Sequence, residues 1–322
     1  MRDDVERAVA VLRGGGLIGL PTETVYGLGA DASNELAVRR IFAVKGRPSN
    51  HPLIVHVAHV DDAKTHAAQW PEAAEVLART FWPGPLTLIV RRAPAVSDAV
   101  TGGQDTVGLR VPDHPLALEL LRAFGGGVAA PSANRYGKVS PTTAQHVTDE
   151  LGGDVDLVLD GGPCRVGVES TIVDVSGPSP RLLRPGGVPR EAVERALARE
   201  VPLLTAATDV RAPGLVASHY APRAGLWLVS AEALPGEATR RLAQGVKVAA
   251  LLAPGLSTPP GVIRFEVAGD EVAYAKALYA ALRAVDAQGV DVVLAVPPLE
   301  TGVGLAVLDR LRRAAAPRPN HP

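Results

Sequence analysis

The chain has 322 residues, of which 47% are hydrophobic and 21% charged, and its formal net charge is −1 at pH 7. This length allows two domains, and the composition is that of a soluble globular protein rather than a disordered one. Because the net charge is close to zero, nothing global indicates a nucleic acid or a membrane as partner, and any anion site must be a local concentration of charge. The single cysteine, Cys164, excludes an internal disulfide and a cysteine-based zinc site.

The first 201 residues mix helix and strand patterns around one continuous core, which predicts an α/β or α+β domain. Apolar residues at helical spacing and short apolar runs define these elements. The predicted helices cover 3–13, 35–44, 72–81, 115–124 and 142–151, and the predicted strands cover 17–20, 53–57, 86–90, 107–111, 127–130, 156–160 and 171–175.

Residues 202–224 are rich in proline and glycine and show little periodicity, which predicts a linker long enough to have a function. Beyond it, strands and helices alternate, which predicts a small doubly wound α/β domain over 225–322. The strands are expected at 226–230, 246–252, 262–267 and 291–296, the helices at 236–243, 271–286 and 303–315, and a frayed tail at 316–322.

The charged, helix-like start of the chain is unlike a signal peptide, and no apolar run reaches the roughly 18 residues of a membrane span. We therefore expect a cytoplasmic protein.

Residues 45–56 form the most informative segment. They carry two cations, Lys45 and Arg47, and two histidines, His51 and His56, and prolines stiffen the turn between them before an apolar strand begins. Cations held on a stiff loop beside a strand are suited to binding a small polyanion. A solvated basic loop is the alternative interpretation of the same pattern.

Polar motifs also follow or precede several predicted strands. The stretch from Pro21 to Leu28 presents hydroxyls and a carboxylate directly after a strand, although a turn that caps a following helix would look the same. Ser132 and Asn134 follow another strand, and Ser140 or Thr142 could cap helix 142–151.

Arg110 lies inside an apolar strand, where it must pair with an anion, either a ligand or a structural carboxylate. Arg184 lies on a tight turn after a short apolar run. There is no Walker motif and no histidine spacing typical of a metal site, so we expect no protein-held metal. Cys164 has no nearby histidine in sequence, which does not favour a catalytic thiol.

In their order along the chain, these motifs resemble the YrdC/Sua5 family of L-threonylcarbamoyladenylate synthases. The matching segments are PTETVYGLGADA (21–32), KGRPSNHPLIVH (45–56), WPGPLTLIV (82–90), VGLRVPDHP (107–115), PSANRYGKVSPT (131–142), GVESTIVDV (167–175) and LLRPG (182–186). The segment SHYAP (218–222) and the domain after it resemble the longer, two-domain Sua5 type.

The resemblance implies a YrdC-like twisted sheet domain with flanking helices over 1–201, a linker or lid over 202–224, and a small Rossmann-like, doubly wound Sua5 domain over 225–322. It implies a nucleotidyltransferase that makes threonylcarbamoyl-AMP and pyrophosphate from L-threonine, bicarbonate or CO2, and ATP carried with Mg2+. A separate tRNA threonylcarbamoyl-transferase complex then moves the threonylcarbamoyl group to adenosine 37 of ANN-decoding tRNAs.

The same resemblance implies the site residues. Threonine contacts are expected from Thr24, His56, Arg110, Ala130 and Ser170. ATP contacts are expected from Arg47, His51, Thr106, Ser132, Ser140, Arg184 and Tyr220, with Lys45 as a phosphate cation. Lys45, Arg47 and Arg110 are the expected catalytic residues, and Tyr220 would close over the nucleotide as part of a lid.

Two other functions fit parts of the pattern. A non-enzymatic RNA-binding module, or weak RNA binding beside the enzyme activity, would use a basic concave surface, but aromatic residues make up only 4% of the chain. Carbamoyl transfer from carbamoyl phosphate, as in related domains of hydrogenase maturation proteins, would require acylphosphatase and zinc-finger-like segments that this sequence lacks.

Overall fold

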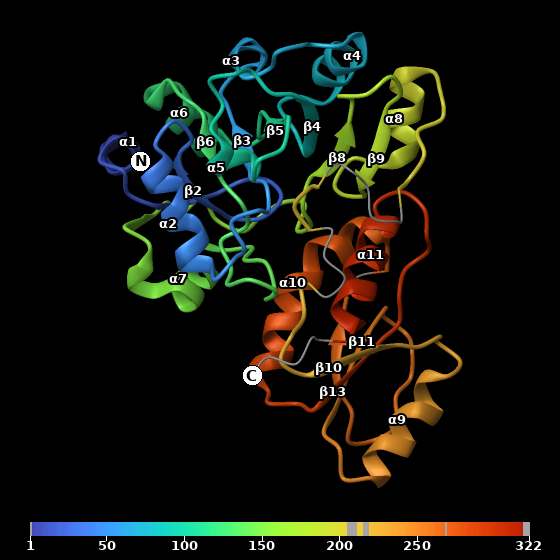
Figure 1. The fold of residues 1–322 in the computed structure, drawn as a ribbon. Helices are drawn as coiled ribbons and strands as arrows, with labels where there is room; N and C mark the ends of the chain where they lie inside the picture. The colour runs from blue at the N-terminus through green and yellow to red at the C-terminus, as the bar shows by residue number, and fades with distance from the viewer. Residues whose placement is uncertain (1, 205–210, 215–218, 268, 318–322) are drawn as a thin grey trace. The chain divides into compact units, whose positions relative to one another are not determined.

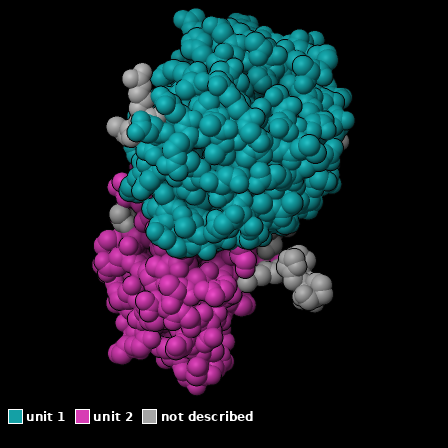
Figure 2. Space-filling model, turned by 90° about the vertical axis from the view of Figure 1, so that its left-hand side faces the viewer, with its two compact units in different colours: residues 1–136, 140–215 teal, residues 137–139, 216–322 magenta. Residues whose placement is uncertain are grey.

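The computed structural model describes residues 2–204, 211–214, 219–267 and 269–317 (Figure 1). The chain divides into two compact units, which Figure 2 shows in two colours. The first consists of residues 1–136 and 140–215, and the second of residues 137–139 and 216–322. Parts of the predicted linker and tail, 205–210, 215–218 and 318–322, lie outside the described residues, and the domain limits 1–201, 202–224 and 225–322 stay a prediction.

Within the described residues, the first unit is built on a mixed sheet of nine strands. These are β1 Ile18–Leu20, β2 Gly27–Asp31, β3 Ile54–His56, β4 Leu86–Arg91, β5 Thr106–Arg110, β6 Val128–Ala129, β7 Leu157–Val158, β8 Thr171–Asp174 and β9 Arg181–Arg184. They lie in the order β7-β1-β2-β6-β3-β5-β4-β8-β9.

Helices cover both faces of this sheet. They are α1 Arg2–Arg13, α2 Glu35–Lys45, α3 Val60–Thr65, α4 Glu72–Phe81, α5 Asp98–Thr101, α6 Pro115–Phe124, α7 Ala144–Leu151, the 3-10 helix η1 Gly152–Asp154, and α8 Arg190–Leu197. Neighbouring residues of β6 face different sides: Val128 packs with α1 and α6, whereas Ala129 packs in the larger core that α2, α4 and α8 share.

The second unit is a parallel sheet with helices on both faces. Its strands are β10 Gly225–Leu228, β11 Val248–Leu252, β12 Ile263–Glu266 and β13 Val292–Ala295, and its helices are α9 Leu234–Ala243, α10 Glu271–Ala287 and α11 Gly304–Ala315. The strand order is β10-β13-β11-β12, and all three pairings are parallel. Leu234 and Ala238 of α9 cover one face, while α10 and α11 pack together (Figure 1). The α/β fold with a small doubly wound second domain is therefore confirmed.

The predicted helices and strands are also confirmed, with boundaries within two residues of those observed. The sequence patterns did not identify β2, β9, α3, α5 or α8. Two alternatives were wrong. The loop from Pro21 leads into β2 and caps no helix. Helix α7 is capped by the side chain of Thr143, which accepts a hydrogen bond from the amide of His146, and not by Ser140 or Thr142.

None of the helices in the described part of the chain is both long enough and apolar enough to cross a membrane.

Candidate active site

Five neighbouring strands bring predicted site residues into one row. His56 ends β3 and lies opposite Arg110, which ends the parallel strand β5. On the other side of β5, Thr87 of β4 lies opposite Ile172 of β8, and Ile172 lies opposite Arg184 at the end of β9. Because neighbouring strands are roughly 4.8 Å apart, residues as far apart in the sequence as His56 and Arg184 lie along one row of the sheet.

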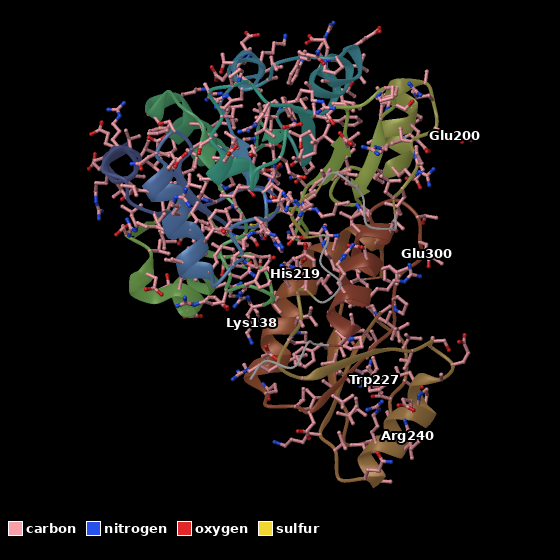
Figure 3. The ribbon with its side chains drawn as sticks, viewed as in Figure 1. Lys138, Glu200, His219, Trp227, Arg240 and Glu300 are labelled. Carbon is pink, nitrogen blue, oxygen red and sulfur yellow. The ribbon has the colours of Figure 1, made fainter. Side chains whose placement is uncertain are left out.

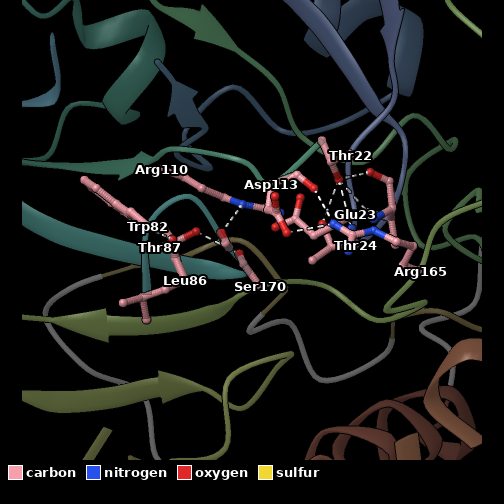
Figure 4. A network of polar contacts seen from close by, with 12 residues as sticks. Thr22, Glu23, Thr24, Trp82, Leu86, Thr87, Arg110, Asp113, Arg165 and Ser170 are labelled. Carbon is pink, nitrogen blue, oxygen red and sulfur yellow. Dashed lines mark hydrogen bonds and ion pairs between the residues drawn. The ribbon is translucent and has the colours of Figure 1, made fainter. Parts of the chain in front are cut away.

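Arg110 is almost fully buried and is paired with a carboxylate of the protein itself. Its Nη2 donates to Oε1 of Glu23 at 2.6 Å, and its Nε donates to the carbonyl of Gly84 at 3.3 Å (Figure 4). The structural salt bridge, one of the two alternatives that the sequence left open, is therefore present, and the guanidinium, with five donors in all, has capacity left for a ligand.

His56 is buried beside this arginine. Burial, and then the charge of Arg110, lower the pKa of His56 to about 3. The imidazole is therefore neutral around pH 7, and it can offer one donor or one acceptor but no positive charge.

Ser170 and Arg184 form a second group at the same edge. The Ser170 hydroxyl shares a 2.7 Å hydrogen bond with the hydroxyl of Thr87. Arg184 donates to the Ser170 carbonyl from Nε and Nη2, at 3.1 and 2.8 Å, and to the Ser170 hydroxyl at 3.2 Å. Next to Ser170, the carboxylate of Glu169 accepts a 2.7 Å hydrogen bond from the hydroxyl of Ser140, which brings a fourth segment to the group.

Lys45 ends α2 and holds the loop that carries Ser132 and Asn134. Its buried Nζ donates to the carbonyl of Ser132 at 2.6 Å and to the carbonyl of Asn134. Burial, and then the nearby Arg47, place the pKa of Lys45 well below its usual value. The structure therefore gives Lys45 a positioning contact in addition to its predicted role as a phosphate cation.

Arg47 and His51 lie on the stiff turn after α2. Arg47 is buried, and its Nη2 donates to the carbonyl of Pro52 at 3.1 Å. The His51 ring meets the ring of Tyr136 edge-on with 5.7 Å between centroids, and burial followed by Arg47 lowers the pKa of His51.

Thr24 and Ala130 lie on loops beside these groups. The Thr24 hydroxyl shares a 2.8 Å hydrogen bond with Thr22, and the Ala130 amide donates to the carbonyl of Ile54 at 2.9 Å. Gly27 packs so closely here that a Cβ at this position would lie 3.1 Å from the Cβ of Ala130.

The two remaining predicted ATP contacts are Thr106 and Tyr220. Thr106 lies two residues before Gly108, which is opposite Ile54, and so it lies on the side of β3 where Pro52 accepts from Arg47. Thr106 begins β5 whereas Arg110 ends it, a separation of roughly 13 Å at 3.3 Å per residue. Tyr220 belongs to the second unit, where it is buried, stacks on Tyr279 with 5.7 Å between centroids, and lies under the guanidinium of Arg310 (Figure 3 labels the neighbouring His219). The nucleotide-binding roles of Thr106 and Tyr220 stay predictions.

Sequence reasoning missed three residues that hold the predicted site residues. Thr87 bonds to Ser170, Glu169 bonds to Ser140, and Glu23 pairs with Arg110. Each of them lies in a motif that the sequence analysis singled out, but no sequence spacing shows which partner, 29 to 87 residues away, each one would meet.

Cys164 is buried, and burial followed by the charge of Glu23 raises the pKa of its thiol to about 12. It is thus protonated around pH 7, in agreement with the low expectation for a catalytic thiol. Within the described ranges, no group of three or more His, Cys, Asp or Glu side chains could hold a metal ion.

Comparison with known proteins finds two family models that together match most of the chain. A family model described as "Telomere recombination", which covers Sua5, YciO and YrdC proteins, matches residues 10–186, and one described as "Threonylcarbamoyl-AMP synthase, C-terminal domain" matches residues 188–316. The chain belongs to the Sua5/YrdC family.

Relatives of the two-domain Sua5 type extend over almost the whole chain. The threonylcarbamoyl-AMP synthase of Pyrococcus abyssi is 43% identical over 97% of this chain and 94% of the relative. That of Bacillus subtilis is 42% identical over 98% and 93%. A crystal structure of P. abyssi Sua5 complexed with L-threonine superposes with a TM-score of 0.92 at 41% identity, and covers 97% of this chain and 94% of that one.

Proposed function

We propose that this chain is an L-threonylcarbamoyladenylate synthase. The observation that carries the proposal is the likeness, at 43% identity over 97% of the chain, to a Sua5 protein named for this activity. The reaction joins L-threonine, bicarbonate and ATP into threonylcarbamoyl-AMP and releases pyrophosphate. It is a nucleotidyl transfer, because the carbamate of threonine attacks the α-phosphate of ATP.

The buried polar row supports the threonine half of the site. Arg110 would hold the threonine carboxylate through a charge-assisted hydrogen bond, and neutral His56 beside it would contact the substrate without competing for that carboxylate. Thr24, Ser170 and the backbone of Ala130 would complete the contacts. Ser170 is suited to this task since Thr87 and Arg184 fix its hydroxyl.

The basic loop and the second group support the ATP half. Lys45 and Arg47 would face the phosphates, with Mg2+ arriving as part of the nucleotide. Contacts to ATP are further assigned to His51, Thr106, Ser132, Ser140, Arg184 and Tyr220, the last as part of a lid. Neither bond-forming step requires a protein nucleophile, so positioning and charge stabilisation can supply most of the catalysis.

The product would pass to a threonylcarbamoyl-transferase complex that modifies adenosine 37 of tRNA, in the cytoplasm. Binding of tRNA to this chain itself, if it contributes, would be weak and would fall with added salt.

Pyrophosphate release from magnesium-ATP tests the proposal. Release that stops when either threonine or bicarbonate is omitted is the expected result, together with threonylcarbamoyl-AMP as the nucleotide product. Arg110→Ala and Lys45→Ala should abolish release, whereas Lys64→Ala, at a partly exposed lysine paired with Glu75, should not. Pyrophosphate release that does not depend on threonine would overturn the proposed function. Full activity of both site variants would overturn the proposed site.

A further inference from the structure

Glu23 has a buried carboxylate in which one oxygen accepts a hydrogen bond and the other has no partner among the described residues. Only 2% of its surface is exposed, and its Oε1 accepts from Arg110 Nη2 at 2.6 Å. Its Oε2 is buried and has no hydrogen-bond partner among the described residues. A buried acceptor without a partner costs free energy, so its persistence calls for an explanation by function or by a bound group.

The backbone around Glu23 holds this carboxylate in place. The Thr22 hydroxyl donates to the carbonyl of Val25 at 2.6 Å, and the amide of Thr24 donates to the Thr22 hydroxyl at 3.2 Å. The amide of Val166 donates to the carbonyl of Glu23 itself at 2.7 Å. The loop is thus fixed on both sides of Glu23, and Figure 4 shows its side chain directed toward Arg110.

The proposed reaction needs a proton acceptor near Arg110. Threonine arrives as an ammonium, which has no lone pair with which to attack bicarbonate. The other titratable groups nearby are unsuited or engaged. His56, with a pKa of about 3, is a weak base, and Cys164, with a pKa of about 12, keeps its own proton. His114 shares a hydrogen bond with the carbonyl of Gly161, and Asp113 is paired with Arg165.

We propose that Glu23 is a catalytic residue that takes a proton from the threonine ammonium through Oε2. The inference rests on the proposed function. A threonine carboxylate bound to Arg110 places its α-amino group one carbon away from that carboxylate, within reach of the carboxylate that Arg110 already holds. Because Arg110 has donors left for the substrate carboxylate, Glu23 stays fixed through Oε1, and its unpartnered Oε2 can meet the ammonium.

The ammonium gives one proton to Glu23 and becomes a neutral amine. The amine then forms a C–N bond to the bicarbonate carbon while a C–O bond breaks, and the leaving hydroxide departs as water with the second amine proton. The carbamate so formed attacks the α-phosphate, pyrophosphate leaves, and Glu23 returns its proton to solvent after product release.

Glu23→Gln tests the role, because an amide oxygen can still accept from Arg110 but the side chain cannot take up the proton. At pH 7.5 we expect kcat for threonylcarbamoyl-AMP synthesis to fall by roughly 10²- to 10⁴-fold, with KM for threonine changed by no more than about threefold. The residual rate should rise with pH, by up to about tenfold per unit, since free threonine then supplies its own neutral amine.

The reverse half-reaction separates chemistry from structure. Formation of ATP from threonylcarbamoyl-AMP and pyrophosphate needs no proton transfer at the amine, so Glu23→Gln should keep it within roughly threefold of the wild-type rate. Equal loss in both directions would reduce Glu23 to a residue that positions Arg110, and would overturn the proposal. Full forward activity of Glu23→Gln would overturn it as well.

Asp174→Asn is the matched control, because Asp174 is also a fully buried carboxylate paired with an arginine, Arg181, but lies at the far end of β8 from Ser170. It should keep the wild-type pH profile. The charged and titratable groups that face Glu23 are Arg110, His114, Cys164 and Arg165, and Asp113 is paired with Arg165. A wild-type enzyme that makes no threonylcarbamoyl-AMP would instead refute the function itself.

Discussion

At the scale of single residues, the buried ion pair of Arg110 and Glu23 bears on stability and, under the proposed function, on the reaction as well. Two charges that are at most 4% exposed gain from each other most of what they lose by leaving water, and neither is tolerated alone. The same pair leaves donors on Arg110 for a second carboxylate. A structural salt bridge and a substrate site are therefore compatible in this position.

Because the two charges are buried together, we expect substitutions of Arg110 and Glu23 to have strongly coupled effects on the free energy of unfolding. Arg110→Met should lower the free energy of unfolding by roughly 3–5 kcal/mol, because the Glu23 carboxylate is left buried without a partner. The double variant Glu23→Leu, Arg110→Met should recover most of this loss, as measured by urea unfolding at pH 7. Equal destabilisation in the single and double variants would contradict the argument.

Because the fold lowers the pKa of His56, we expect the free energy of unfolding to depend on pH. In the unfolded chain His56 binds a proton below about pH 6.5, whereas in the fold its pKa is about 3. Between these values the unfolded state binds more protons, so the free energy of unfolding falls as the pH falls, by up to about 1.4 kcal/mol per unit. His56→Asn should flatten the dependence between pH 7 and pH 5, whatever its effect on absolute stability, and a variant with the wild-type slope would refute the assignment.

The same residues show what the sequence could predict of the site. An arginine in an apolar strand and a stiff cationic loop stand out by residue type alone, because burying or fixing charge is costly and needs a reason. The partner of Arg110 could not be predicted, because Glu23 lies 87 residues away and only the strand order of the folded sheet brings the two together. The idle oxygen of Glu23 likewise exists only in three dimensions.

At the scale of elements, the start of helix α7 carries two hydroxyls whose partners differ. Thr143 accepts the capping bond from His146, whereas Ser140, three residues earlier, donates to Glu169. Thr143→Ala should therefore destabilise the protein by about 1 kcal/mol with unchanged kinetics. Ser140→Ala should raise KM for ATP. Unfolding and steady-state assays of the two variants check this, and a raised KM in Thr143→Ala with lost stability in Ser140→Ala would refute the assignment.

Most of the elements that the sequence patterns did not identify were missed for physical reasons. Strand β2 reads Gly-Leu-Gly-Ala-Asp, without β-branched residues or clear alternation, and it is a strand because β1 and β6 lie on both sides of it. Helices α3 and α5, with six and four residues, are too short for a periodic pattern. By contrast, α8 has a helical pattern in sequence and was overlooked.

At the scale of the whole molecule, the division into units cuts across the sequence. Residues 137–139 belong to the second unit, although Tyr136 and Ser140 on either side belong to the first. Inside the second unit, the amide of Ala221 donates to the carbonyl of Gly137 at 3.1 Å, and Arg283 on α10 donates to the carbonyl of Val139. The second unit thus holds the middle of the segment whose ends carry Asn134 and Ser140.

This arrangement gives the second unit a predicted role in ATP binding. Arg283→Ala removes the bond to Val139, so the segment between Asn134 and Ser140 becomes less ordered, and part of the ordering cost is transferred to nucleotide binding. We expect KM for ATP to rise roughly threefold to tenfold, equivalent to about 1 kcal/mol, while KM for threonine and kcat stay nearly constant. Arg240→Ala, which removes an exposed arginine of the same unit that is paired with Glu237, is the control and should leave all three constants unchanged. Equal values of KM for ATP in the two variants would mean that the second unit does not order this segment for the nucleotide.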